Sequence, residues 1–165
     1  AERGELSPVQ TADLLRGCID DLRLAIDTLG EGEIDLAMVA GNLRFRMAPR
    51  LQAAGIKLRW DLSGLPDALS LPGSVVLPLL RVLQEAMANA MRHSGARQLQ
   101  IGLAAGAGAL TLDVSDDGHG FDLDSYAAGN GLAGMKKRAR ALGAELRVAS
   151  SAQGTTVHLK VPLVP

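Results

Sequence analysis

Residues 115–122 read SDDGHGFD, two adjacent acidic residues followed by two glycines that a single residue separates. They follow an alternating run of apolar and polar side chains, LTLDV, which predicts a strand. Gly118 and Gly120 allow the backbone to turn tightly and to approach a flat ligand closely. A carboxylate only accepts hydrogen bonds, so Asp116 can bind an exocyclic amine such as that of adenine. The alternative for this stretch taken alone is an ordinary Asp-Gly turn.

A long helix is predicted before this strand, over residues 75–95, although Pro78 leaves its start uncertain. Glu85, Asn89 and Arg92 are four and three residues apart, and with the adjacent His93 they form a polar stripe. Oxygen ligands suit Mg2+ and arginine suits phosphate, so the stripe could hold a metal-bound polyphosphate. A solvated helix face is the other interpretation.

A third glycine-rich stretch, GNGLAGM at residues 129–135, precedes a helix predicted to continue to about residue 144. Free backbone N–H groups at a helix start favour phosphate oxygens. The stretch matches neither the Rossmann nor the Walker pattern, because it lacks GxGxxG after a strand and GK[ST]. A nucleotide site built from it would be of another kind.

The remaining pattern predicts an α+β fold, a two-layer sandwich. Strands are expected near residues 56–62, 97–105, 109–115, 144–151 and 155–163. The last four form hairpins, so we expect a mixed, mostly antiparallel sheet with helices on one face. One of these helices covers residues 38–55 and is expected to be broken or kinked near Pro49.

An N-terminal helix is predicted over residues 11–33, ending near Gly30 and Gly32. Its apolar residues step by four, three, four and three, which is the spacing of a coiled coil or helical bundle: Leu15, Ile19, Leu22, Ile26 and Leu29. The alternative is a helix lying on its own domain.

Composition excludes several classes of function. The 165 residues carry a net charge of −1 with one Trp, one Tyr and two Phe, so nucleic acid is not an expected ligand. The single Cys18 forms no internal disulfide, and no stretch has the pattern of a membrane span or signal peptide. We expect a cytoplasmic piece without membrane contact, whose parent protein can be membrane-anchored elsewhere.

Four motifs in order over residues 74–162 resemble those of the Bergerat-fold ATPases. QEAMANAMRHS resembles the N box, DDGHGF the G1 box, GNGLAGM the G2 box, and QGTTVHLKVP the closing GT strand. The match is with the catalytic and ATP-binding domain of sensor histidine kinases, in the subfamily paired with helix-turn-helix response regulators. DDLRLAIDTL resembles the end of that subfamily's dimerisation domain. The resemblance therefore implies two parts, the tail of the dimerisation bundle at residues 1–30 and the catalytic and ATP-binding domain at residues 31–165.

The resemblance implies a role for each matching residue. Asp116 would bind the adenine amine, with Thr155 assisting through water and Gly118 and Gly120 leaving room for the base. Asn89 would hold Mg2+, and Glu85 would assist phosphoryl transfer as a base or second metal-side carboxylate. The other implied ATP contacts are Arg92 and His93 near the phosphates or ribose, Gly129 and Gly131 as hinges of an ATP lid over residues 121–130, and Leu132 beside them.

Two features depart from the family pattern. Asp117 stands where many relatives have Asn, and its charge has no partner identifiable from the sequence. The phosphoacceptor histidine box is absent, since His93 lies in the N box, His119 in the G1 loop and His158 in the last strand. His158 is expected to be a strand residue on an edge or partly buried.

The expected activity is transfer of the γ-phosphoryl of Mg-ATP to a histidine outside this fragment, and from there to an aspartate of a response regulator. The expected partners are the protein's own dimerisation domain, a cognate response regulator and a second copy in the full-length homodimer. Alternatives are an anti-sigma serine kinase of the same fold and a nucleotide-sensing module without phosphotransfer.

Overall fold

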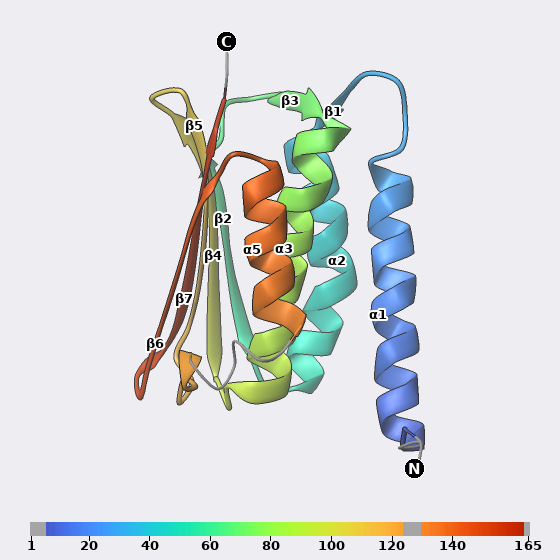
Figure 1. Cartoon of the computed structure of the whole chain (residues 1–165), viewed down its shortest axis with the longest axis vertical. Helices are drawn as coiled ribbons and strands as arrows, with labels where there is room; N and C mark the ends of the chain where they lie inside the picture. Colours follow the sequence, from blue (N-terminus) through green and yellow to red (C-terminus); the bar gives the residue numbers. More distant parts are fainter. Residues whose placement is uncertain (1–5, 124–129, 164–165) are drawn as a thin grey trace.

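The computed structural model describes residues 6–123 and 130–163. A five-stranded sheet forms one layer and helices form the other (Figure 1). The strands are β2 (Lys57–Gly64), β4 (Gln98–Gly106), β5 (Ala109–Asp116), β6 (Glu145–Ser151) and β7 (Gly154–Pro162). Their order is β2-β4-β5-β7-β6, with β2 parallel to β4 and every other pair antiparallel. The predicted two-layer sandwich with a mixed, mostly antiparallel sheet is confirmed.

Alternation along the central strands places one apolar row against the helices. Residues of β4, β5 and β7 in this row are at most 4% exposed: Leu99, Ile101, Leu103, Leu110, Leu112, Val114, Val157, Leu159 and Val161. Burying a side chain of this size stabilises the fold by roughly 1.5–3 kcal/mol. The opposite face of the sheet carries polar residues, so the helical layer and the core lie on one side only.

Three helices pack on the apolar face: α2 (Leu36–Ala53), α3 (Gly73–His93) and α5 (Asn130–Ala141). Of the break or kink expected near Pro49, the break is wrong, because α2 runs through Pro49 without interruption. Pro49 is exposed, so water can hydrate the carbonyl that its missing N–H leaves unpaired. Pro78 likewise lies inside α3, whose N-cap is Pro72.

The helix α1 (Pro8–Asp27) lies outermost, beyond α2 and α3 (Figure 1). A capping box between Ser7 and Gln10 starts it, and Leu24 is its one buried residue. The five residues of the predicted seam are 47–76% exposed. The helix contacts α2 and α3 through the face opposite the seam, so the seam residues do not hold it on this domain.

A short antiparallel ribbon of β1 (Glu33–Asp35) and β3 (Ser70–Pro72) was not predicted, since three-residue strands carry little pattern. It joins the chain after α1 to the start of α3, and Asp35 caps α2 by accepting from the Met38 N–H at 3.1 Å. Among the described helices, none combines the length and apolar composition needed to cross a membrane.

Candidate functional site

A pocket lies between α3, α5 and the sheet, next to the end of β5. Its apolar lining is Ala86, Val114, Phe121, Met135, Val148 and Val157, and its polar lining is Asn89, His93, Ser94, Asp116 and Thr155. Apolar walls with a few convergent polar groups are typical of small-molecule sites. The fold thus brings together four of the predicted site residues, which come from α3, β5 and β7.

The carboxylate of Asp116 is held rigidly at the end of β5. Its Oδ1 accepts a hydrogen bond from the Gly118 N–H at 2.9 Å, which is the local turn that Asp favours. Among the described residues, none donates to its Oδ2. One oxygen therefore fixes the side chain and the other remains able to accept from a ligand.

The two glycines of this loop are required by contacts within the protein itself. A Cβ at Gly118 would lie 2.2 Å from the Ser94 carbonyl oxygen, at the end of α3. A Cβ at Gly120, whose φ is +66°, would lie 2.0 Å from the Ser151 carbonyl oxygen of β6. The loop is thus clamped between α3 and β6, a constraint that the sequence pattern alone did not indicate.

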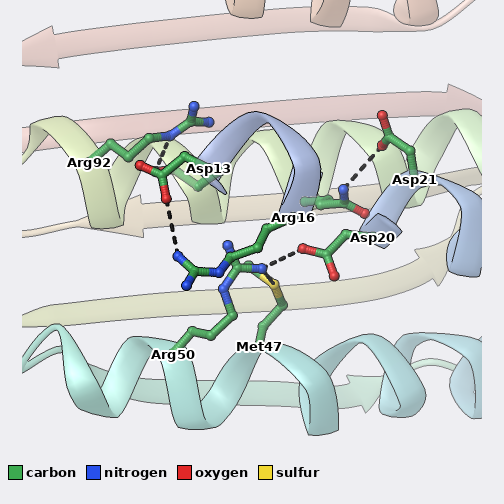
Figure 2. A network of polar contacts seen from close by, with 9 residues as sticks. Asp13, Arg16, Asp20, Asp21, Met47, Arg50 and Arg92 are labelled. Carbon is green, nitrogen blue, oxygen red and sulfur yellow. Dashed lines mark hydrogen bonds and ion pairs between the residues drawn. The ribbon is translucent and has the colours of Figure 1, made fainter. Parts of the chain in front are cut away.

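The polar stripe of α3 is divided between two neighbouring surfaces. Asn89 and His93 line the pocket, whereas Glu85 and Arg92 line a groove of about 530 Å3 between α1, α2 and α3. Arg92 donates from Nε to the Ala88 carbonyl oxygen at 3.3 Å and lies near Asp13 of α1 (Figure 2). Two predicted functional residues therefore face α1 rather than the pocket.

Polar contacts hold α1 along this groove. Arg50 of α2 pairs with Asp20, and Gln84 of α3 donates to Asp21 at 3.1 Å (Figure 2). Beyond the groove, Arg46 of α2 pairs with Asp27 at 2.8 Å. The contact between α1 and the rest of the protein is therefore largely electrostatic, with Leu24 as its apolar anchor.

The G2 region lies partly outside the described residues. Residues 124–129 of the expected lid, which include Gly129, are outside the described part of the chain. Gly131 and Leu132 lie in the first turn of α5, where Leu132 is buried, and Met135 of the next turn reaches the pocket. The first turn of α5 thus precedes, by one turn, a residue that lines the pocket.

Comparison with known families decides where the chain belongs. Residues 74–165 match the family of histidine kinase-, DNA gyrase B- and HSP90-like ATPases. The chain belongs to this ATPase family. The match covers α3, the pocket and the sheet from β4 to β7.

Curated relatives of the ATPase domain are sensor histidine kinases. LnrJ of Bacillus subtilis is 36% identical over 151 residues, which are 91% of this chain and 36% of the relative. MctS of Rhizobium johnstonii is 34% identical over 157 residues, which are 91% of this chain and 33% of the relative. The chain spans about a third of the length of these proteins.

Solved structures share the fold of this ATPase domain. The histidine kinase domain of the Erythrobacter litoralis EL346 blue-light activated histidine kinase aligns with a TM-score of 0.77 at 24% identity, covering 93% of this chain and 81% of that one. Full-length ShkA in complex with AMPPNP aligns with a TM-score of 0.67 at 19% identity, covering 99% of this chain and 41% of the other.

The charge of Asp117, a departure from the family pattern, has its partner in the main chain. Its Oδ1 accepts from the N–H groups of Arg97 and Gln98, each at 2.8 Å. These hydrogen bonds, chiefly that from Gln98, hold the pKa of Asp117 below its ordinary value. Asp117 thus anchors the start of β4.

The histidines outside the pocket have structural partners. His119 places Nδ1 2.8 Å from the Gly120 carbonyl oxygen. His158 lies on β7, an interior strand, half-buried and with Nδ1 2.6 Å from Asp113 of β5. It is therefore a partly buried strand residue and not an edge residue.

Two residues in or next to the pocket were missed by sequence reasoning. Ser94 lines the pocket, donates to the Ala90 carbonyl oxygen at 2.7 Å and accepts from the Ala96 N–H at 3.0 Å. Ser150 accepts from the Phe121 N–H at 2.8 Å and lies 3.1 Å from Thr155 Oγ1. The sequence does carry a signal for Ser150. It is a polar residue at the position where the alternation of Leu146 and Val148 predicts another inward, apolar side chain.

Proposed function

We propose that residues 31–165 are the catalytic and ATP-binding domain of a sensor histidine kinase, and that residues 1–30 are the end of its dimerisation bundle. The domain would transfer the γ-phosphoryl of Mg-ATP to a histidine outside these residues, and a response-regulator aspartate would receive it next. The observation that carries the proposal is the convergence of Asn89, His93, Asp116 and Thr155 on one pocket.

The adenine end of the ligand is assigned to Asp116 and Thr155. Asp116 Oδ2 accepts from the exocyclic amine, while the Gly118 N–H keeps Oδ1 in place. Thr155 is 9% exposed and presents its hydroxyl to the same pocket, directly or through water. An amine at this position distinguishes adenine from guanine, which carries a carbonyl oxygen there.

The phosphate end is assigned to α3 and the start of α5. The amide oxygen of Asn89 is a hard ligand of the kind that Mg2+ prefers, with phosphate oxygens completing the set. Among the described residues, no group of three His, Cys, Asp or Glu could hold a metal by itself. His93, Gly129, Gly131 and Leu132 would contact ribose or phosphates, aided by the free N–H groups of the first turn of α5. Bound Mg2+ would neutralise phosphate charge.

The acceptor side of the reaction is assigned to Glu85 and Arg92. Both line the groove next to α1, on the α3 face adjacent to that of Asn89 and His93. A group that assists transfer must lie between the phosphates and the incoming histidine. We therefore propose that Glu85 acts on the acceptor as a base or second metal-side carboxylate, and that Arg92 stabilises the transferred phosphoryl group.

The exposed seam of α1 supports a dimeric parent protein. The exposed apolar residues of the seam on α1 are Leu15, Ile19, Leu22 and Ile26, on the side away from the ATPase domain, and Leu29 follows just after the C-cap Thr28. Such spacing buries its apolar side chains against other helices. We propose that the rest of the dimerisation bundle and a second copy cover it.

Ligand entry requires side chains of the pocket to move. The free volume among them is about 20 Å3, which is room for roughly one water molecule. Phe121, the first residue of the expected lid, is part of this lining. We propose that Phe121 moves out when the base enters, which links base binding to the segment that follows.

The experiment is calorimetric titration of the 165-residue chain with ATP and Mg2+. Asp116→Asn presents a donor to the donor amine, so we expect affinity to fall roughly ten- to a hundredfold. Asp117→Asn is the matched control, because this neighbouring carboxylate binds the main chain of β4. It should keep the ATP affinity within about twofold. Equal affinity for Asp116→Asn and the unaltered chain would refute the assignment.

A further inference from the structure

We infer that Ser150 is a positioning residue that orients the hydroxyl of Thr155 into the nucleotide pocket and links it to the backbone of Phe121. This inference rests on the proposed ATP-binding function. Ser150 itself does not line the pocket, so it would act through the two residues that do, Thr155 and Phe121.

The location of Ser150 is unusual for the strand that carries it. Inward positions of β6 are Leu146, Val148 and Ser150, and the first two pack on the core. Ser150 is the direct partner of Thr155 in the antiparallel pairing of β6 with β7. Two hydroxyls therefore face each other at the end of a row whose preceding side chains on β6 are apolar.

Ser150 Oγ has two partners, a backbone N–H and a hydroxyl. The Phe121 N–H can only donate, so Ser150 Oγ accepts from it at 2.8 Å. Among the described residues, the one acceptor within reach of the Ser150 proton is Thr155 Oγ1, at 3.1 Å. Either hydroxyl could donate in this contact; we take Ser150 as the donor, which leaves the proton of Thr155 available for the pocket.

Close backbone packing keeps this relay in place. A Cβ at Gly120 would lie 2.8 Å from Ser150 Oγ and 2.0 Å from the Ser151 carbonyl oxygen. A Cβ at Gly154 would lie 1.9 Å from the Asp116 carbonyl oxygen. The loop after β5 and the β6–β7 hairpin are therefore pressed together on both sides of Ser150.

The consequence is a donor from Thr155 beside an acceptor from Asp116. Adenine presents the complementary pair, an amine donor next to a ring-nitrogen acceptor, whereas hypoxanthine presents a carbonyl next to an N–H. By fixing the direction of the Thr155 hydroxyl, Ser150 contributes to the choice of purine. Without it, the Thr155 proton could turn back toward the protein.

The test compares Ser150→Ala with Ser151→Ala by calorimetry with ATP and Mg2+. Loss of one hydrogen bond predicts an ATP affinity about three- to tenfold lower for Ser150→Ala, with a smaller preference for ATP over inosine triphosphate. The Ser151 side chain points outward and accepts from the Gln153 N–H, so Ser151→Ala should bind as the unaltered chain does.

A double-mutant cycle tests whether Ser150 affects ATP binding through Thr155 or through general packing of the protein. In a Thr155→Val background, Ser150→Ala should lower affinity by less than about twofold, because the group through which it acts is gone. The Phe121 amide should exchange faster in Ser150→Ala and not in Thr155→Val. Unchanged ATP affinity in Ser150→Ala, unchanged Phe121 exchange, or a full additional loss in the Thr155→Val background would each overturn the inference.

The unaltered chain distinguishes the two claims. If it binds ATP while Ser150→Ala behaves identically, the ATP-binding function stands and the role of Ser150 is wrong. If it does not bind ATP, the proposed function is wrong, and the role of Ser150 fails with it.

Discussion

Adjacent acidic residues at the end of β5 have different partners and therefore different functions. Asp116 keeps one oxygen for the pocket, whereas Asp117 accepts two main-chain hydrogen bonds at the start of β4. From the sequence these residues look equivalent, because both follow the same strand. Only the neighbouring strand, twenty residues earlier in the chain, separates their roles.

The hydrogen bonds to Asp117 predict a pH-dependent contribution to stability. They lower its folded-state pKa below the ordinary value of 3.8, so the folded protein binds this proton less readily than the unfolded chain. The stability that Asp117 contributes is fully present at pH values above its ordinary pKa, and it is lost as pH falls through its lowered folded-state pKa. In urea unfolding, the stability difference between the unaltered chain and Asp117→Asn should be constant above about pH 5 and shrink below pH 4.

The amide in Asp117→Asn can still accept from Arg97 and Gln98 but does not titrate in this range. The pH dependence of the unfolding free energy of Asp117→Asn therefore comes from all the other titrating groups. Subtracting it from that of the unaltered chain leaves the contribution of Asp117. A stability difference that stays constant down to about pH 3 would contradict this account.

At the scale of elements, α1 depends on ion pairs more than on apolar contact. Arg46 pairs with Asp27 while its Nε and Nη2 lack partners among the described residues. Asp27→Asn would leave the half-buried guanidinium without its counter-charge, at a cost of about 1–3 kcal/mol to the docking of α1. Amide exchange across residues 8–27 should accelerate relative to β4, and 1 M salt should act in the same direction.

Asp13→Asn is the matched control for this prediction. Asp13 lies fourteen residues before Asp27, but its partner Arg16 is on α1 itself and both side chains are more than half exposed. Such a pair contributes about 0–1 kcal/mol, so α1 exchange should change little. Equal acceleration in both variants would indicate that helix propensity, and not docking, had changed.

At the scale of the whole molecule, the pocket at the end of β5 and the groove next to α1 lie on adjacent faces of α3. The 165-residue chain should bind ATP and form essentially no phosphohistidine, while the full-length parent should become labelled. Glu85→Ala in the parent should lower the transfer rate about 10²- to 10⁴-fold with little change in ATP affinity, because Glu85 lies outside the pocket.

Asn89→Ala is the comparison in the same parent protein. It should weaken both affinity and rate, since a metal held by Asn89 would contact ground-state phosphates as well. Labelling with γ-³²P ATP gives the rate, and calorimetry gives the affinity. Labelling of His93, His119 or His158 in the isolated 165 residues, or an unchanged rate in Glu85→Ala, would contradict the assignment.

Local pattern was sufficient for most of the fold. The alternation in β4, β5, β6 and β7 and the glycine spacing at residues 118–120 and 129–131 are short-range features, since each depends on backbone geometry within a few residues. The apolar seam of the N-terminal helix follows from helical periodicity in the same way, whereas the exposure of that seam became known only from the structure. The continuous α2 did not follow, because the cost of Pro49 depends on whether its neighbourhood is exposed.

What the tertiary structure alone decided are contacts between distant segments. Three sets of contacts join residues that no periodicity relates. Asp117 binds the start of β4, Ser150 contacts both Phe121 and Thr155, and the acidic face of α1 pairs with Arg46 and Arg50. The division of the α3 stripe depends on which neighbour covers each face, the sheet and α5 on one side and α1 on the other. A sequence specifies which side chains share a helix or strand face, but their partners exist only once the layers pack.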